Sequence, residues 1–150
     1  MAYTNKSKQG GFLVHKIKYL NTRLFNRLLQ ADARALFNGE QGKILSVLWD
    51  EGECTASDIA DITGLANSTL SIMLKRMEEN GLIISYDDSN DKRKRIYSVS
   101  ALGREQQIVG NEISDALSDI FYDGFSDIEI QDFESYLKRI LDNMKSEYYK

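Results

Sequence analysis

The fold of the chain is decided by residues 57–79, which read SDIADITGLANSTLSIMLKRMEE. Apolar residues at helical spacing predict two short helices, over residues 57–63 and 67–79. Gly64 lies between them and permits the tight turn that a pair of crossing helices needs. Asn67 or Ser68 can cap the second helix. The stretch therefore predicts a helix-turn-helix.

The second of these helices has one apolar and one polar side. At about 100° per residue, Leu70, Leu74 and Met77 fall together and are expected to face inward. Ile72 lies at the centre of the opposite side, where a single exposed apolar residue is common. If the helix enters a DNA major groove, however, Ile72 has a physical partner in the thymine methyl group. The outward side and its flanks carry Ser68, Ser71, Ile72, Lys75, Arg76 and Glu79.

The rest of the chain is predicted to be mostly helical. Apolar periodicity predicts a long helix through residues 13–28 and another over about 40–51. Alternating residues predict two half-buried strands, around 82–86 and 96–99, joined as a hairpin. Ser100 can cap a following helix with Val109, Ile113, Ala116 and Ile120 on one face. The fold class is thus mainly α with a small antiparallel β-hairpin, and the absence of proline agrees with it.

Both ends of the chain carry long apolar stripes. Leu13, Ile17, Leu20, Leu24 and Leu28 form the first stripe. The second has the three-four spacing of a coiled-coil seam and comprises Ile130, Phe133, Leu137, Ile140 and Met144. A core of 150 residues leaves few faces for so many stripes, so we expect both helices to pack in a homodimer. Packing onto the subunit's own core is the alternative.

Charge is distributed unevenly along the chain. The net charge of −4 excludes a uniformly basic surface for nucleic acid. Residues 1–49 carry eight Lys and Arg against two Asp and Glu, whereas residues 105–150 carry four against eleven. A polyanion must therefore bind the first two-thirds of the chain.

A cationic run ends the segment Asp88–Arg95, which we call the wing tip. A charge run is usually a solvated loop, but this one follows a helix-turn-helix and joins two strands, where it could reach phosphates or a minor groove. Asp91 is expected to pair with one arginine across the turn. Strand alternation predicts Arg93 and Arg95 on one side and Lys92 and Lys94 on the other.

These segments together resemble the multiple-antibiotic-resistance regulator (MarR) family of winged-helix transcription factors. The resemblance rests on the helix-turn-helix, the run Glu79-Asn80-Gly81-Leu82-Ile83, the wing tip, and Val99-Ser100-Ala101-Leu102-Gly103. The family usually has Leu-Thr where this chain has Val99-Ser100. The resemblance covers essentially residues 1–150. It implies a winged helix-turn-helix DNA-binding region over 40–103 and a helical dimerisation region formed by 11–36 and 104–148.

The resemblance also implies a function. We expect a sequence-specific DNA-binding regulator, a repressor, acting as a homodimer on a palindromic operator and released by a small aromatic or phenolic ligand. Tyr19, Phe37 and Trp49 could line the ligand cavity, with core packing as the alternative use of each. The residues expected to contact double-stranded DNA are Ser68, Thr69, Ser71, Ile72, Lys75, Arg76, Lys92, Arg93, Lys94 and Arg95.

Two other functions stay open on the same fold. One is a winged-helix protein-interaction module with no DNA partner, for which Ile72 would be a docking residue. The other is an oxidant or metal sensor. His15 is the only histidine, so we expect no metal site, and Cys54 is expected to be a buried, inert thiol whose pKa Glu51 and Glu53 raise.

Several classes of protein are not expected. The sequence has no glycine-rich phosphate loop or nucleophile elbow, so we expect neither an enzyme nor a cofactor. No apolar run has the roughly 20 residues of a membrane span, and the run Phe12-Leu13-Val14 is too short for a signal-peptide core. We therefore expect a cytoplasmic protein with no membrane partner.

Overall fold

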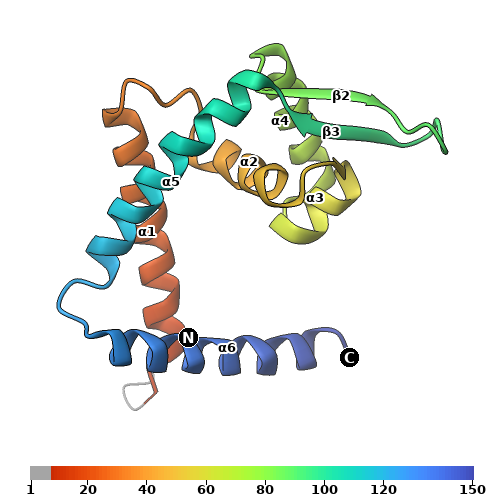
Figure 1. Ribbon diagram of the computed structural model, residues 1–150. Helices are drawn as coiled ribbons and strands as arrows, with labels where there is room; N and C mark the ends of the chain where they lie inside the picture. Colours follow the sequence, from red (N-terminus) through yellow and green to blue (C-terminus); the bar gives the residue numbers. More distant parts are fainter. Residues whose placement is uncertain (1–7) are drawn as a thin grey trace. The chain divides into compact units, whose positions relative to one another are not determined.

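The computed structural model describes residues 8–150, which form six helices and three short strands (Figure 1). The mainly α fold with a small antiparallel sheet is confirmed. Two compact units are present, one ending at Asp115 and the other comprising Ala116–Lys150. None of the helices in the described residues is long and apolar enough to cross a membrane. In chain order the elements are α1 (Gly10–Ala31), α2 (Gly39–Glu51), β1 (Cys54–Thr55), α3 (Ala56–Thr63), α4 (Asn67–Glu79), β2 (Ile83–Asp87), β3 (Arg95–Val99), α5 (Ala101–Phe121) and α6 (Asp127–Tyr148).

The predicted helix-turn-helix is confirmed as α3 and α4. Thr55 caps α3 in a reciprocal capping box with Asp58. Gly64 ends α3 with a φ of 75°, the left-handed conformation that glycine adopts without strain. The predicted capping of α4 by Asn67 or Ser68 is wrong. Its N-cap is Ala66, with no side-chain cap, because the helix already begins at Asn67.

The hairpin belongs to a three-stranded antiparallel sheet of order β1-β3-β2. β2 pairs with β3 from Ile83 opposite Val99 to Asp87 opposite Arg95. The third strand, β1, pairs only Cys54 and Thr55 with Tyr97 and Ile96. Sequence analysis missed β1 because two residues show no periodicity. The part of the hairpin from the Asp87–Arg95 pair outward therefore has no contact with β1, and only the pairing of β2 with β3 supports it.

The core of the first unit is built on α2, α3, α4 and the start of the sheet. Its largest fully buried side chains are Ile44, Leu45, Leu48, Ile59, Leu70, Leu74, Met77, Leu82 and Ile83. Val109 and Ile113 of α5 are buried as predicted. Ala116 and Ile120 do not continue their face, since both are exposed, and Leu117, four residues after Ile113, is buried instead.

The terminal stripes remain largely uncovered within the single chain. Leu13, Ile17 and Leu20 of α1 are 49%, 42% and 48% exposed. In α6, Ile140 and Met144 are 48% and 66% exposed. Packing of these stripes in a homodimer and packing onto the subunit's own core both stay predictions.

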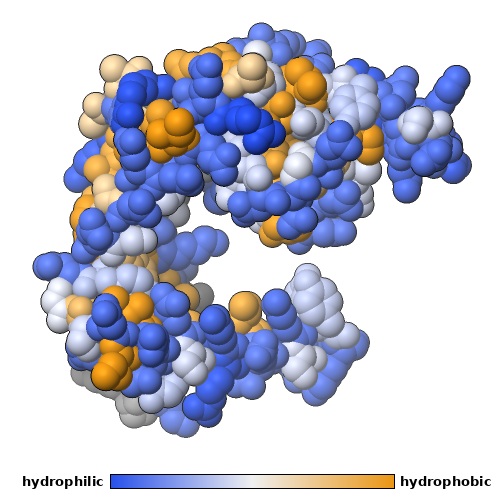
Figure 2. Space-filling model, in the orientation of Figure 1, coloured by the Kyte–Doolittle hydropathy of each residue, from blue (hydrophilic) through white to orange (hydrophobic). Residues whose placement is uncertain are grey.

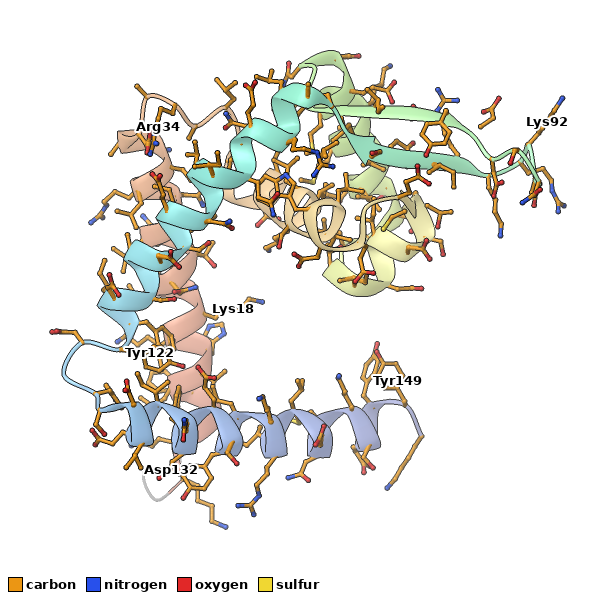
Figure 3. The ribbon with its side chains drawn as sticks, viewed as in Figure 1. Lys18, Arg34, Lys92, Tyr122, Asp132 and Tyr149 are labelled. Carbon is orange, nitrogen blue, oxygen red and sulfur yellow. The ribbon has the colours of Figure 1, made fainter. Side chains whose placement is uncertain are left out.

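A buried glutamine ties the segment between α1 and α2 to α5. The Gln106 side chain accepts a hydrogen bond from Leu36 N at 2.8 Å and donates one to Arg34 O at 3.1 Å. The Arg34 guanidinium (Figure 3) pairs with Asp32 at 2.8 Å and with Glu112 at 2.6 Å. Hydrogen bonds from Arg34 lower the pKa of Asp32 to about 2. The segment between α1 and α2 is thus attached to α5 through its backbone, by Gln106, and through the Arg34 side chain, by Glu112.

The start of α5 is held by a close backbone approach. Ser100 caps the helix as predicted: its Oγ accepts from Gly103 N at 3.0 Å and donates to Gly81 O at 2.5 Å. Trp49 Nε1 donates to Gly103 O at 3.0 Å. A Cβ on Gly103 would lie 2.0 Å from Leu82 O, so this position has no room for a side chain.

We predict that Gly103→Ala destabilises the protein. The added methyl group must push α5 away from the Leu82 carbonyl, and overpacking of this kind costs about 1–3 kcal/mol of unfolding free energy. Urea unfolding followed by circular dichroism measures the loss. Gly11→Ala is the control, because a Cβ there meets no atom within 4 Å, and its stability should be unchanged or slightly higher. Equal stabilities of the two variants would contradict the prediction.

Candidate nucleic-acid interface

One side of α4 is buried in the core and the opposite side is exposed, as the sequence predicts. Leu70, Leu74 and Met77 are no more than 2% exposed and anchor the helix in the core. Ile72 points the other way and is 63% exposed. The hydroxyl residues of the first two turns, Ser68, Thr69 and Ser71, are exposed beside it, as are the cations Lys75 and Arg76.

The charges on α4 are divided along its length. Among residues 8–150, the Lys75 and Arg76 side chains have no hydrogen-bond or ion-pair partner. Glu78 and Glu79 lie at the carboxyl-terminal end. The uncapped amino-terminal turn leaves its backbone N–H groups without a side-chain acceptor, and such groups favour an anion. The first turns can therefore approach a polyanion, and the last turn opposes it.

The wing tip is shaped by Asp91. Its Oδ1 accepts from Arg93 N at 3.1 Å and from Arg93 Nε at 3.0 Å, which confirms the expected pairing with an arginine. Hydrogen bonds from the Arg93 side chain and then its backbone lower the pKa of Asp91 below its usual value. Lys94 N donates to Asp91 O, and Asp88 N donates to Lys94 O, both at 3.0 Å. The Arg93 side chain stays 91% exposed despite its partner.

The predicted alternation of the four wing-tip cations is wrong. β3 begins only at Arg95, so Lys92, Arg93 and Lys94 lie in a turn, where strand alternation does not apply. The Lys92 and Lys94 side chains form no hydrogen bond or ion pair within the described part of the chain. Lys92 points away from the hairpin at its far end (Figure 3), and this end of the molecule is almost entirely hydrophilic (Figure 2).

Arg95 is held differently from its neighbours. Its Nε donates to Ser85 Oγ at 2.8 Å, and its Nη1 donates to Asp87 Oδ1 at 3.1 Å. The same Ser85 hydroxyl donates to the Glu78 carboxylate on α4. Sequence analysis missed this link because its members come from three elements, and only the register Ser85–Tyr97 and Asp87–Arg95 brings them together.

The three candidate ligand-pocket residues do not line one common cavity: Phe37 and Trp49 are in contact, and Tyr19 lies elsewhere. Phe37 and Trp49 meet edge to face in the core, with ring centroids 5.9 Å apart. Tyr19 is 54% exposed on α1, with the Arg23 guanidinium 5.3 Å from its ring centroid. It lines an open hollow with Phe12, His15 and Lys16. The structure thus brings two of the three together and gives those two a packing role.

The residues considered for sensing are placed as follows. Cys54 is 5% exposed, and burial, followed by the charges of Asp58 and Glu51, raises the pKa of its thiol. Glu53, also expected to raise it, instead accepts a hydrogen bond from the Tyr86 hydroxyl. His15 is exposed on α1. Within residues 8–150, no three His, Cys, Asp or Glu side chains are grouped to hold a metal ion.

Comparison with known proteins identifies the fold and a family match over part of the chain. Residues 37–94 match the model of the MarR family, and no curated protein matches the sequence. MarR from E. coli in its apo form is 20% identical, with a TM-score of 0.75 over 88% of this chain and 96% of that chain. MepR from S. aureus, solved as a complex with DNA, is 22% identical, with a TM-score of 0.78 over 89% and 97%.

A third solved structure also has a similar fold. PcaV from Streptomyces coelicolor, solved with its natural ligand, is 18% identical, with a TM-score of 0.76 over 95% of this chain and 98% of that chain. Identities this low show a shared fold. Together with the family model, which matches residues 37–94, they show that the chain has the winged-helix fold and that its central segment is similar to the MarR family.

Proposed function

We propose that the protein is a sequence-specific double-stranded DNA-binding transcriptional regulator, acting as a repressor. The observation that carries this proposal is the outward side of α4. It presents hydroxyls, Ile72 and two unpaired cations, on a helix whose opposite side is locked into the core. The cationic wing tip belongs to the same compact unit.

In the proposed complex α4 lies in a major groove. The hydroxyls of Ser68, Thr69 and Ser71 bond base edges or phosphates, and Ile72 contacts a thymine methyl group. Lys75 and Arg76 neutralise phosphates or bond guanine. The wing tip, with Lys92, Arg93, Lys94 and Arg95, flanks the helix and lies along the adjacent backbone or minor groove.

The proposed regulator is a homodimer on a palindromic operator. Residues 11–36 and 104–148 form its dimerisation region, residues 40–103 its DNA-binding region, and the exposed stripes of α1 and α6 pack between subunits. Two-fold symmetry then places the half-sites about one helical turn apart. The MepR complex with DNA supports the partner, and the PcaV complex with its natural ligand supports the existence of an effector, which we propose to be a small aromatic or phenolic molecule.

We predict that the double substitution R93A/R95A abolishes the operator shift in gel-retardation assays and leaves dimerisation intact. The duplex is one that the protein selects from a random library. Binding of the unchanged protein should weaken steeply with salt, with a logarithmic slope of about −0.9 per neutralised phosphate.

The matched control is K138A/R139A, which removes two exposed cations from α6. It should leave the operator shift unchanged. Sedimentation of both double variants checks that the dimer persists. An equal loss of binding in the two variants would show that net charge, and not the wing tip, governs binding.

A second prediction concerns Ile72. Replacing it by valine removes one methylene from the proposed thymine contact, and a buried methylene is worth about fourfold in affinity. Ile72→Val should therefore weaken operator binding about fourfold per half-site, or about 15-fold for the homodimer, as measured by fluorescence anisotropy titration, without changing the thermal unfolding midpoint. Ile108→Val is the control, because Ile108 is 64% exposed on α5 and Ile72 is 63% exposed on α4. Unchanged binding of Ile72→Val would remove Ile72 from the interface.

A further inference from the structure

Four side chains link the end of α4 to the outer part of the hairpin. Glu78 on α4 accepts from the Ser85 hydroxyl on β2, and Ser85 accepts in turn from Arg95 on β3. Arg95 also donates to Asp87 on β2. We call Glu78, Ser85, Arg95 and Asp87 the helix–wing clasp. It connects α4 by side-chain hydrogen bonds to the part of the hairpin beyond the buried residues Leu82 and Ile83.

We propose, resting on the proposed function, that the helix–wing clasp sets the position of the wing tip relative to α4, and that Arg95 is a positioning residue and not a DNA contact. The sequence run Lys92–Arg95 thereby divides into two kinds of cation. Within residues 8–150, Lys92 and Lys94 have no hydrogen-bond or ion-pair partner, and Arg93 pairs only within the wing tip. Arg95 alone reaches across the hairpin and, through Ser85, to the helix.

The sheet itself cannot supply this positioning. β1 pairs only with Ile96 and Tyr97, which lie opposite Tyr86 and Ser85, so the hairpin is a two-stranded ribbon from the Asp87–Arg95 pair outward. Ribbons of this kind are marginally stable and variable in twist. A side-chain brace from α4 through Ser85 to Arg95 ends at the Asp87–Arg95 pair, where this two-stranded part begins.

The planar guanidinium of Arg95 is well suited to the helix–wing clasp. A guanidinium presents several donors in one plane, so Arg95 bonds a hydroxyl and a carboxylate at once, which a lysine ammonium on a flexible stem does less well. A single exposed ion pair contributes little. Here, however, the four groups are coupled through one hydroxyl, and removal of Ser85 Oγ disconnects α4 from β3.

Ser85→Ala tests the proposal, because it cuts the clasp without changing any charge. We expect operator binding to weaken by about three- to tenfold while the salt slope and thermal stability stay unchanged. Arg95→Ala should weaken binding to a similar degree, and the double variant S85A/R95A no further than Arg95→Ala alone. Arg95→Lys should not restore binding. Ser98→Ala is the control, since Ser98 is a half-buried β3 serine without a side-chain hydrogen bond.

A direct phosphate contact by Arg95 gives the opposite pattern. In that case Ser85→Ala binds normally, Arg95→Lys retains most of the affinity, and Arg95→Ala loses about one phosphate contact per subunit, so that the salt slope of the homodimer falls by about 1.8. That result would overturn the inference and leave the proposed function standing. If the unchanged protein fails to distinguish its selected duplex from random DNA, the proposed function itself fails.

Hydrogen exchange of the free protein gives a readout independent of DNA. Ser85→Ala should speed amide exchange in residues 86–95 relative to the unchanged protein, while exchange in α2 stays the same. Ser98→Ala should leave the hairpin unchanged. Unaltered exchange of the hairpin in Ser85→Ala would show that the clasp does not order the wing tip.

Discussion

The burial of one side of α4 is the constraint on which the candidate interface depends. Leu70, Leu74 and Met77 enter the same core as Ile44, Leu48 and Ile59, so α4 cannot rotate about its axis without exposing large apolar side chains. Each residue of the opposite side is thereby fixed in direction. Recognition of a regular polymer requires such fixed directions, because the spacing of its chemical groups is also fixed.

The wing tip is held in shape by hydrogen bonds, whereas α4 is held in place by burial of its apolar side. It has almost no apolar contacts, and its shape comes from hydrogen bonds of Asp88, Asp91 and the backbone of Lys94. A cationic loop of this kind would repel itself if all four cations were unpaired. Pairing Arg93 with Asp91 and Arg95 with Asp87 keeps the positive groups close together at moderate electrostatic cost.

Features that depend on short-range spacing could be predicted from the sequence. Features that depend on contacts between distant segments could not. The orientation of α4, the cap at Ser100 and the pairing of Asp91 each follow from short-range spacing, and the structure confirms all three. Local patterns carry no information about β1, which forms only because β3 offers an open edge to Cys54 and Thr55. For the same reason, the tie of Arg95 to Ser85 could not be predicted: it depends on strand register and on where β3 begins. The DNA contacts proposed for α4 and the wing tip, and the positioning role proposed for Arg95, remain predictions.

The tie made by Gln106 has a consequence for how this chain can vary. Its amide bonds only backbone atoms, Leu36 N and Arg34 O, which every residue except proline provides in full. The segment joining α1 to α2 can therefore diversify in side chain and keep its attachment to α5. Position 106 has less freedom, because its side chain must reach both backbone atoms and must donate to one and accept from the other. Related chains that preserve this attachment should change freely at 36 and seldom at 106, whereas a change at 34 also removes the ion pairs with Asp32 and Glu112.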